Sequence, residues 1–286
     1  MGFKCGVVGL PNVGKSTLFN ALTNAGAEAA NYPFCTIEPN LGVVPVPDPR
    51  LEQLVRIVKP KNVVPAVVNI LDIAGLVKGA GKGEGLGNQF LANIRECDAI
   101  LHVLRCFDDP NIVHVEGSVD PIRDKQIIDF ELQFKDLETV EKRLQKVQKA
   151  AKVGDKDAKV ESERLERLVE HLNAGRNVRS LAFGDEEAVY VRSLFLLTAK
   201  PVLYVCNVDE NSLSGNRWTQ EVFAMAEAEN AGAIVVCAAL EEQIAALENE
   251  NERREFLEAM GIEEPGLNKL IRAAYALLGL QTYFTA

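Results

Sequence analysis

A glycine-rich segment near the start of the chain has the residue types and spacing of a phosphate-binding loop. Residues 9–16 read Gly-Leu-Pro-Asn-Val-Gly-Lys-Ser and fit the pattern GxxxxGK[ST]. They follow an apolar run at 3–8 and precede a helical stretch at 15–24. In such a loop the backbone N–H groups surround a β-phosphate, and glycines allow the close approach. We predict a nucleoside triphosphate site whose binding residues are Asn12, Val13, Gly14, Lys15, Ser16 and Thr17.

The same segment predicts where positive charge and a metal ion would lie. Lys15 would place a cation between the β- and γ-phosphates, and the Ser16 hydroxyl would be a ligand of Mg²⁺. The helix that begins here adds the positive end of its dipole. A chance glycine-rich turn is the alternative, which the flanking strand and helix disfavour. Lys15 is therefore our first candidate catalytic residue.

A second segment predicts the rest of the metal site. Asp72 ends the apolar run 67–71, and at the tip of a neighbouring strand its carboxylate can hold Mg²⁺ through water. The Gly75 amide can contact the γ-phosphate, and Thr36, in an earlier loop, can complete the metal shell. The alternatives are a structural aspartate and an ordinary loop threonine. We predict Ser16, Thr36 and Asp72 as metal ligands and Gly75 as a catalytic group. Glycines follow at 79, 81, 83, 85 and 87, as in segments that become ordered around a triphosphate.

Residues 207–210, Asn-Val-Asp-Glu, follow another apolar run and are candidates for contacting the base. Guanine presents N1–H and an N2 amino group to a carboxylate, whereas adenine N1 is an acceptor that a carboxylate repels. The Asn207 amide can bond adenine N6 and N7, and Val208 offers no cation over the base. A site without the right partners rejects a base strongly. These residues favour ATP, although Glu210 could still reach guanine.

Two further side chains are candidates for assisting hydrolysis. Many related enzymes orient the attacking water with a glutamine after the glycine of this second segment, but Leu76 stands there and has no hydrogen-bonding group. We hypothesise that His114, in a polar loop, orients water or contacts the γ-phosphate; an exposed loop histidine is the alternative. Asn12 could coordinate K⁺ to offset negative charge, or it could simply stabilise the turn.

The order of elements along the chain predicts an α/β fold. Apolar, β-branched runs at 3–8, 67–72, 99–105, 201–207 and 233–237 alternate with helical stretches such as 88–96 and 267–278. Runs without polar alternation are typical of strands covered on both faces. We therefore predict a doubly wound, mostly parallel sheet of the P-loop type.

Residues 130–197 break this alternation. Leu137, Val140, Leu144 and Val147 are spaced by three or four positions, and Gly154-Asp155 separates two such stretches, which predicts an inserted antiparallel helical hairpin. Basic residues cluster near its turn, either as a solvated surface or as a docking surface for RNA or protein. The predicted domains are 1–129 with 198–280 for the nucleotide, 130–197 for the insertion, and 281–286 as the start of a truncated further domain.

Composition limits the other classes of function. The chain has 286 residues and a net charge of −10, which argues against a whole-surface nucleic-acid binder and against sequence-specific DNA binding. No uncharged apolar run is long enough to span a bilayer. Six scattered cysteines without metal-ligand spacing read as reduced thiols. We expect a cytoplasmic protein with no membrane partner.

These segments resemble the translation-factor class of P-loop GTPases, and within it the Obg-related family. Residues 31–40 and 72–76 look like the two switches of that family, and the helical insertion with Asn207-Val-Asp-Glu210 narrows the resemblance to the YchF-type ATPases. That resemblance implies an ATPase with Mg²⁺, a ribosome-associated partner, and a C-terminal TGS domain that the chain lacks. An Obg-type GTPase is one alternative. A binding module that nucleotide locks, with negligible hydrolysis, is the other.

Overall fold

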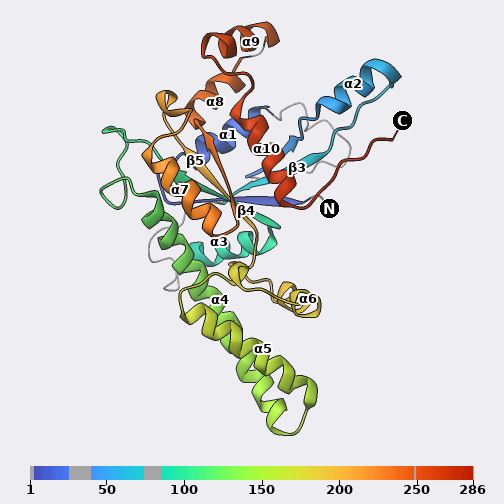
Figure 1. The fold of residues 1–286 in the computed structure, drawn as a ribbon, viewed down its shortest axis with the longest axis vertical. Coiled ribbons are helices and arrows are strands. Elements are labelled where there is room, and N and C mark those ends of the chain that lie inside the picture. Colours follow the sequence, from blue (N-terminus) through green and yellow to red (C-terminus); the bar gives the residue numbers. More distant parts are fainter. Residues whose placement is uncertain (1–2, 26–39, 74–84, 248, 286) are drawn as a thin grey trace.

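A single six-stranded sheet forms the centre of the molecule (Figure 1). The computed structural model describes residues 3–25, 40–73, 85–247 and 249–285. The sheet has the strand order β2-β3-β1-β4-β5-β6, and its pairs are parallel except for β2 with β3. The strands are β1 (Lys4–Val8), β2 (Leu41–Pro45), β3 (Val67–Asp72), β4 (Ala99–Arg105), β5 (Val202–Asn207) and β6 (Gly232–Val236).

Helices connect these strands and cover both faces of the sheet. In Figure 1, α1 and α10 lie on one side of the strands, and α3 and the start of α4 lie on the other. The helices are α1 (Lys15–Ala25), α2 (Pro49–Val58), α3 (Gly85–Glu96), α4 (Pro121–Lys152), α5 (Lys156–Asn173), α6 (Asp185–Ser193), α7 (Arg217–Ala228), α8 (Ala238–Ala245), α9 (Glu250–Ala259) and α10 (Gly266–Leu277). The part of the chain that the structure describes also contains the short 3₁₀ helices η3 (Val178–Ser180) and η4 (Glu210–Ser212).

The predicted doubly wound, mostly parallel sheet is confirmed, and the five predicted strands are all present. The prediction did not include β2, the antiparallel edge strand. Its burial alternates along only five residues, and it contains Gly42. A Cβ on Gly42 would lie 2.5 Å from the Thr23 side chain of α1, so the helix approaches the strand here too closely for a larger residue.

Burial on both faces explains why the central strands read as apolar runs. All seven residues of β4 and all six of β5 are buried. Because the five strands from β3 to β6 run parallel, their carboxyl ends meet at one edge of the sheet. In the order β3, β1, β4, β5 and β6, the strands end at Asp72, Val8, Arg105, Asn207 and Val236. In open α/β sheets, ligands bind at this edge.

Helices α4 and α5 form an antiparallel hairpin that projects from the sheet (Figure 1). Asp120 caps the start of α4, and Gly154, with φ +97°, makes the turn between the two helices. Ile128 and Leu132 of α4 pack in the apolar core of the sheet, whereas Val140 and Val147 pack in a second cluster within the insertion. Helix α4 therefore continues through residue 130, the predicted domain boundary, and the division into domains stays a prediction.

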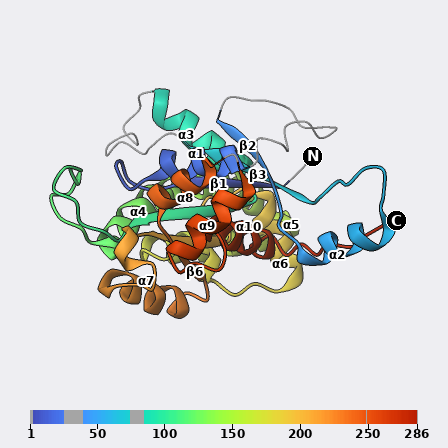
Figure 2. The same cartoon turned by 90° about the horizontal axis from the view of Figure 1, so that it is seen from above.

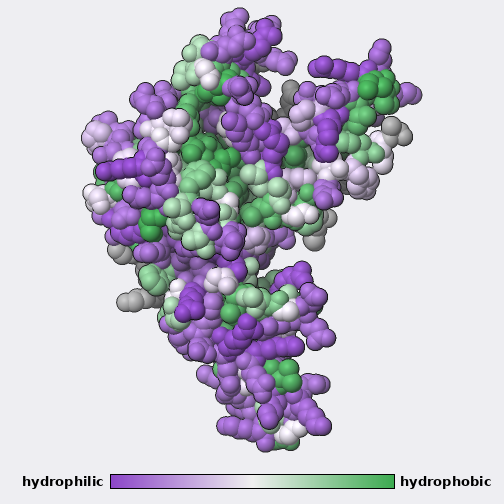
Figure 3. All heavy atoms as spheres, viewed as in Figure 1, coloured by the Kyte–Doolittle hydropathy of each residue, from purple (hydrophilic) through white to green (hydrophobic). Residues whose placement is uncertain are grey.

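The surface of the hairpin is mainly hydrophilic, as Figure 3 shows for one face. Seen from above, α2 and the C-terminal segment lie on the side opposite the segment between β4 and α4 (Figure 2). Within the described residues, no helix combines the length and the apolar character that crossing a membrane requires.

Candidate nucleotide-binding site

The predicted phosphate-binding loop connects β1 to α1, and two of its glycines are required by close contacts. A Cβ on Gly9 would lie 2.5 Å from the Val103 carbonyl oxygen of β4. Gly14 has φ +94°, and a Cβ there would lie 2.2 Å from Asn207 Nδ2. The Leu18 N–H donates to the Gly14 carbonyl at 3.0 Å and begins α1. The loop therefore lies directly against β4 and the end of β5, with the N-terminus of α1 beside it.

Lys15 is buried within this loop. Its ammonium donates to the Leu10 carbonyl at 2.6 Å, and its exposed fraction is 7%. Burial lowers the pKa of Lys15 to about 8, and the charge of Asp72 partly opposes that shift. The structure thus brings Lys15 and Asp72 together at the loop, as the sequence predicts for a site that neutralises phosphate.

Asp72 carries a buried carboxylate oxygen, Oδ1, that has no hydrogen-bond partner. Burial raises the pKa of Asp72, and the Lys15 charge opposes this shift. Leaving such an oxygen unpaired is costly, and hard cations such as Mg²⁺ take oxygen ligands. Ser16, in the first turn of α1, is exposed. Both side chains carry oxygen donors of the kind that Mg²⁺ takes, and their role as metal ligands stays a prediction.

Several predicted residues cannot be placed around this metal site. Thr36, Gly75 and Leu76 lie outside the described residues. Within the described part of the chain, no group of three or more His, Cys, Asp or Glu side chains could hold a metal ion. A metal here would therefore depend on hydroxyl, phosphate and water oxygens besides Asp72.

A pocket of about 460 Å³ opens beside the phosphate-binding loop. The loop and α1 contribute Asn12, Gly14 and Thr17 to its lining, and the segment 207–211 forms another wall. Both of these walls contain residues predicted from the sequence. The other two walls were not predicted; they are formed by Phe107, Asp109 and Ile112 after β4 and by residues 237–239 after β6. The pocket is where a base would lie if phosphates occupied the loop.

Asn207 joins the loop to this pocket. Its Nδ2 donates to the Val13 carbonyl at 2.9 Å, and its Oδ1 accepts from the Ala238 N–H at 2.9 Å. The side chain is buried. One amide hydrogen and one lone pair remain, because an asparagine side chain has two of each. Asn207 therefore both positions the loop and keeps the capacity to bond a base.

The next three residues have different surroundings. Val208 is 2% exposed and belongs to the apolar core, so its side chain is fixed from behind the pocket. Asp209 accepts from the Asn211 N–H at 2.9 Å and caps η4. Glu210 Oε1 accepts from Gln243 Nε2 of α8 at 3.3 Å. The Glu210 carboxylate is thus tied to α8 at the rim of the pocket.

Arg105, at the end of β4, holds in place the pocket wall after β4, which was not predicted from the sequence. Its guanidinium is buried and donates to the carbonyls of Phe107, Asp109 and Ile112 at 3.1, 3.3 and 3.0 Å. It also lies over the Phe107 ring, 4.6 Å from the centroid. The sequence signal for this role is an arginine at the end of a mainly apolar run, and in the sheet it lies level with Asn207.

The residues that directly follow this wall, Val113 and His114, make bonds to two other parts of the structure. Asn12, with φ +62°, donates from Nδ2 to the Val113 carbonyl at 3.1 Å. His114 Nδ1 accepts from the Glu116 N–H at 3.1 Å, so Nε2 carries the proton and donates to Asp124 Oδ2 at 2.8 Å. The His114 side chain is 6% exposed. Its role in hydrolysis stays a prediction, and it would require these bonds to break.

Comparisons with known proteins agree with this geometry. The family described as "50S ribosome-binding GTPase" matches residues 4–159. "Ribosome-binding ATPase YchF" of Escherichia coli O157:H7 is 57% identical over the whole chain, which covers 78% of that protein. The protein of the same name from Bacillus subtilis is 56% identical, and the chain covers 79% of it.

A solved structure extends the match to three dimensions. The Schizosaccharomyces pombe YchF GTPase superimposes with a TM-score of 0.85 and 39% identity, covering 97% of this chain and 76% of that one. These likenesses span the phosphate-binding loop, the sheet and the helical insertion together. This chain therefore belongs to the YchF family of P-loop nucleoside triphosphate hydrolases.

Proposed function

We propose that this chain is a Mg²⁺-dependent ATPase that cleaves the β–γ phosphoanhydride bond. The observation that carries the proposal is the meeting of the buried Lys15 ammonium with the buried, unpaired Asp72 oxygen at one glycine-rich loop. Outside such a site, burying the Lys15 ammonium with its single bond to Leu10 and leaving the Asp72 oxygen unpaired would only destabilise the fold. A bound metal–triphosphate would satisfy both.

The residues of this site act mainly by positioning and by charge. Lys15 would leave the Leu10 carbonyl and contact phosphate oxygens, where negative charge develops during phosphoryl transfer. Ser16 and Asp72 would hold Mg²⁺, which supplies charge neutralisation between the β- and γ-phosphates. Water would attack the γ-phosphorus, its oxygen forming the new P–O bond as the bond to the β-phosphate oxygen breaks. The water protons would pass to the phosphate products and solvent.

The pocket supports ATP over GTP. Asn207 retains one donor and one acceptor, which can meet adenine N7 and N6. Glu210 is bonded to Gln243, and it is one methylene longer than the aspartate that accepts guanine in GTPases. The related proteins carry both names, ATPase in bacteria and GTPase in Schizosaccharomyces pombe, so direct measurement is needed.

Separate binding titrations with the two nucleotides test this preference. Purified protein with Mg²⁺ is titrated with ATP and with GTP, and heat of binding is recorded. We expect ATP to bind at least about tenfold more tightly, equivalent to about 1.4 kcal/mol. Equal affinities, or tighter binding of GTP, would refute the preference and favour the Obg-type alternative.

A ribosome-associated partner is proposed from the names of the relatives and from the charge of the hairpin. Exposed lysines follow α4 toward the turn, and among the described residues none of them forms an ion pair: Lys142, Lys146, Lys149 and Lys152. Unpaired cations on one surface suit a phosphate backbone. A ribosomal partner would also place the chain in the cytoplasm.

Sedimentation with ribosomes tests the surface. Lys146→Gln with Lys149→Gln should weaken binding, and binding should become less sensitive to salt because phosphate contacts are lost. Lys59→Gln with Lys61→Gln, two exposed lysines near α2, is the matched control. Unchanged binding of the hairpin variant would remove the hairpin from the proposed interface.

Two features of the site bear on the rate. His114 is held at both ring nitrogens, which favours slow hydrolysis and keeps the nucleotide-locked binding module as a second candidate. Negligible turnover with ribosomes supplied would support that candidate.

The Asn12 amide donates from Nδ2 to the Val113 carbonyl, which leaves its Oδ1 available to coordinate K⁺. Equal rates in K⁺ and Na⁺ buffers would refute the cation role.

A further inference from the structure

The segment between β4 and α4, residues 106–120, contacts the phosphate-binding loop near its middle. Asn12 Nδ2 donates to the Val113 carbonyl across 101 positions of sequence. The next residue, His114, is bonded to Asp124 in the first turns of α4. Two hydrogen bonds, linked by the backbone between Val113 and His114, therefore connect the loop that would hold the phosphates to α4, the first helix of the hairpin.

Hydrogen bonds hold this segment at both of its ends. Arg105 fixes three of its carbonyls near β4, as described above. At the other end, Arg123 donates to the Ser118 carbonyl at 2.6 Å and to Asp124 Oδ1 at 3.0 Å. Asp120 accepts from the Arg123 N–H at 3.0 Å and caps α4. Side-chain hydrogen bonds therefore attach one end of the segment to β4 and the other end to the start of α4.

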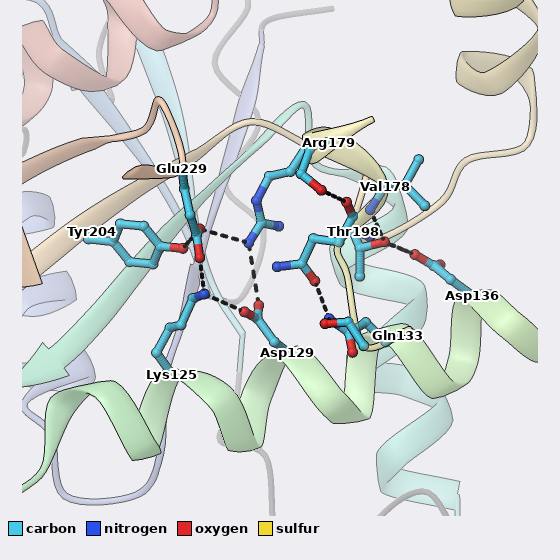
Figure 4. Close-up of polar contacts among 12 residues, drawn as sticks. Lys125, Asp129, Gln133, Asp136, Val178, Arg179, Thr198, Tyr204 and Glu229 are labelled. Carbon is cyan, nitrogen blue, oxygen red and sulfur yellow. Dashed lines mark hydrogen bonds and ion pairs between the residues drawn. The ribbon is translucent and has the colours of Figure 1, made fainter. Parts of the chain in front are cut away.

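Beyond Asp124, α4 itself carries a row of buried polar side chains that bond to neighbouring elements (Figure 4). Lys125 pairs with Asp129 at 2.9 Å and with Glu229, the residue that follows α7. Asp129 also pairs with Arg179 of η3 at 3.4 Å. Tyr204 of β5 donates to Glu229 Oε2 at 2.7 Å, which attaches the cluster to the sheet.

The row continues along α4 with two further side chains, Gln133 and Asp136. Gln133 donates to Asn177 Oδ1 at 2.8 Å. Asp136 accepts from the N–H groups of Leu197 and Thr198 at 2.8 and 2.7 Å. These bonds lie between the two apolar clusters, the one that ends on α4 at Leu132 and the one that includes Val140. Apolar packing thus joins the first half of α4 to the core of the sheet, polar contacts follow in its middle, and its second half packs in the apolar cluster of the insertion.

We propose that α4 transmits the nucleotide state of the phosphate-binding loop to the outer end of the helical hairpin through the contacts Asn12–Val113 and His114–Asp124. Nucleotide in the loop and pocket would touch Asn12 and Ile112 and so favour one position of the segment. The segment would shift the first turns of α4, and the rigid helix would move the hairpin. Asp124 is the positioning residue of this path. The inference rests on nucleotide binding at the proposed site.

Distance measurement between two spin labels tests the inference. The labels are placed at Lys152→Cys on the hairpin and Glu227→Cys on α7, both exposed, in a chain whose Cys35 is replaced by serine. The other five cysteines are buried and would not react. A non-hydrolysable ATP analogue with Mg²⁺ is expected to shift the mean distance in the otherwise unchanged chain. Asp124→Ala should abolish the shift while the analogue binds within about threefold of its original affinity.

Two further variants separate this role from loss of stability. Asp124→Asn keeps an acceptor for His114 Nε2 and should restore at least part of the shift. Glu241→Ala removes another buried carboxylate, which accepts from the Gly266 N–H far from the path, and should leave the shift intact. Unfolding curves are recorded for each variant to show that it is folded.

Two results would overturn the inference while the proposed function stands. One is a full shift in Asp124→Ala. The other is the absence of any shift in the labelled chain although the analogue binds. Failure of the labelled chain to bind the analogue, when the unlabelled chain also fails, would refute the proposed function and this inference with it.

Discussion

Gly14 of the phosphate-binding loop and Asn207 at the end of β5 occupy adjoining space. A Cβ on Gly14 would lie 2.2 Å from Asn207 Nδ2, and that nitrogen donates to the neighbouring Val13 carbonyl. The same asparagine accepts from the Ala238 N–H after β6. The phosphate-binding loop and the base pocket are therefore in direct contact through Asn207. A substitution at Gly14 or Asn207 should weaken the binding of both the phosphates and the base.

Gly14→Ala should abolish tight nucleotide binding. The new methyl group would displace Asn207, and φ +94° would strain any residue with a side chain. We expect ATP affinity measured by calorimetry to fall by about 100-fold or more, equivalent to about 2.7 kcal/mol. Gly261→Ala is the control, because Gly261 also has a positive φ but nothing lies within 4 Å of the added Cβ. ATP affinity retained in Gly14→Ala would contradict the close packing.

Glu210→Asp should shift the site toward GTP. The shorter side chain loses its bond to Gln243 and presents a carboxylate of the length that GTPases use for guanine N1–H and N2. We expect the ratio of ATP to GTP affinity to fall by about tenfold in competition titrations. Glu242→Asp makes the same chemical change at an exposed position on α8. A ratio that stays the same in both variants would show that Glu210 does not determine the base.

Asp72→Asn should remove the contribution of Mg²⁺ to nucleotide binding. The unpaired Oδ1 is the described oxygen best placed for the metal, and a neutral amide is a poorer ligand than a carboxylate. ATP affinity is measured with Mg²⁺ and with a chelator. We expect a large gain from Mg²⁺ in the original chain and less than about a threefold gain in the variant. Asp98→Asn, at the opposite edge of the sheet, should keep the full gain; an equal gain in Asp72→Asn would exclude Asp72 from the metal site.

Lys15 makes the stability of the nucleotide-free protein depend on alkaline pH. Burial lowers its pKa to about 8 in the folded state, against 10.5 for an ordinary lysine. Between these values the unfolded chain binds more protons than the folded one, so the free energy of unfolding rises with pH. The rise should reach at most about 3 kcal/mol across this window.

Lys15→Met provides the comparison for this pH dependence. Methionine fills similar space without a titrating group, so the rise above pH 8 should be smaller in the variant by the Lys15 contribution. Urea unfolding at several pH values measures both chains. If the free energy of unfolding changes with pH in the same way for both chains, burial of the Lys15 ammonium does not destabilise the folded state.

Most of the sheet could be predicted because burial on both faces leaves a strong signal in the sequence. Every position of β4 is buried, and its run of apolar residues shows this directly. Strand β2 could not be recognised in the same way, since it is an edge strand with alternating burial. Its glycine is explained by contact with Thr23, which depends on how α1 packs and not on neighbours in sequence.

The site was predictable where chemistry fixes the spacing of residues and not where folding brings distant residues together. The loop 9–16 and Asp72 belong to the first kind. The Arg105 contacts and the Asn12–Val113 bond belong to the second kind, because their partners depend on the path of residues 106–120. The buried partner of His114, Asp124, was likewise not visible in the spacing. Thr36 and Gly75 stay predictions, since both lie outside the described residues.

The affinity of Lys15→Ala for ATP with Mg²⁺, measured by calorimetry on protein shown to be folded, tests the central claim most directly. If the buried ammonium at the loop is what grips the polyphosphate, binding should weaken by about 100-fold or more. An affinity equal to that of the original chain would mean that triphosphate binds elsewhere, and the proposed site would be wrong.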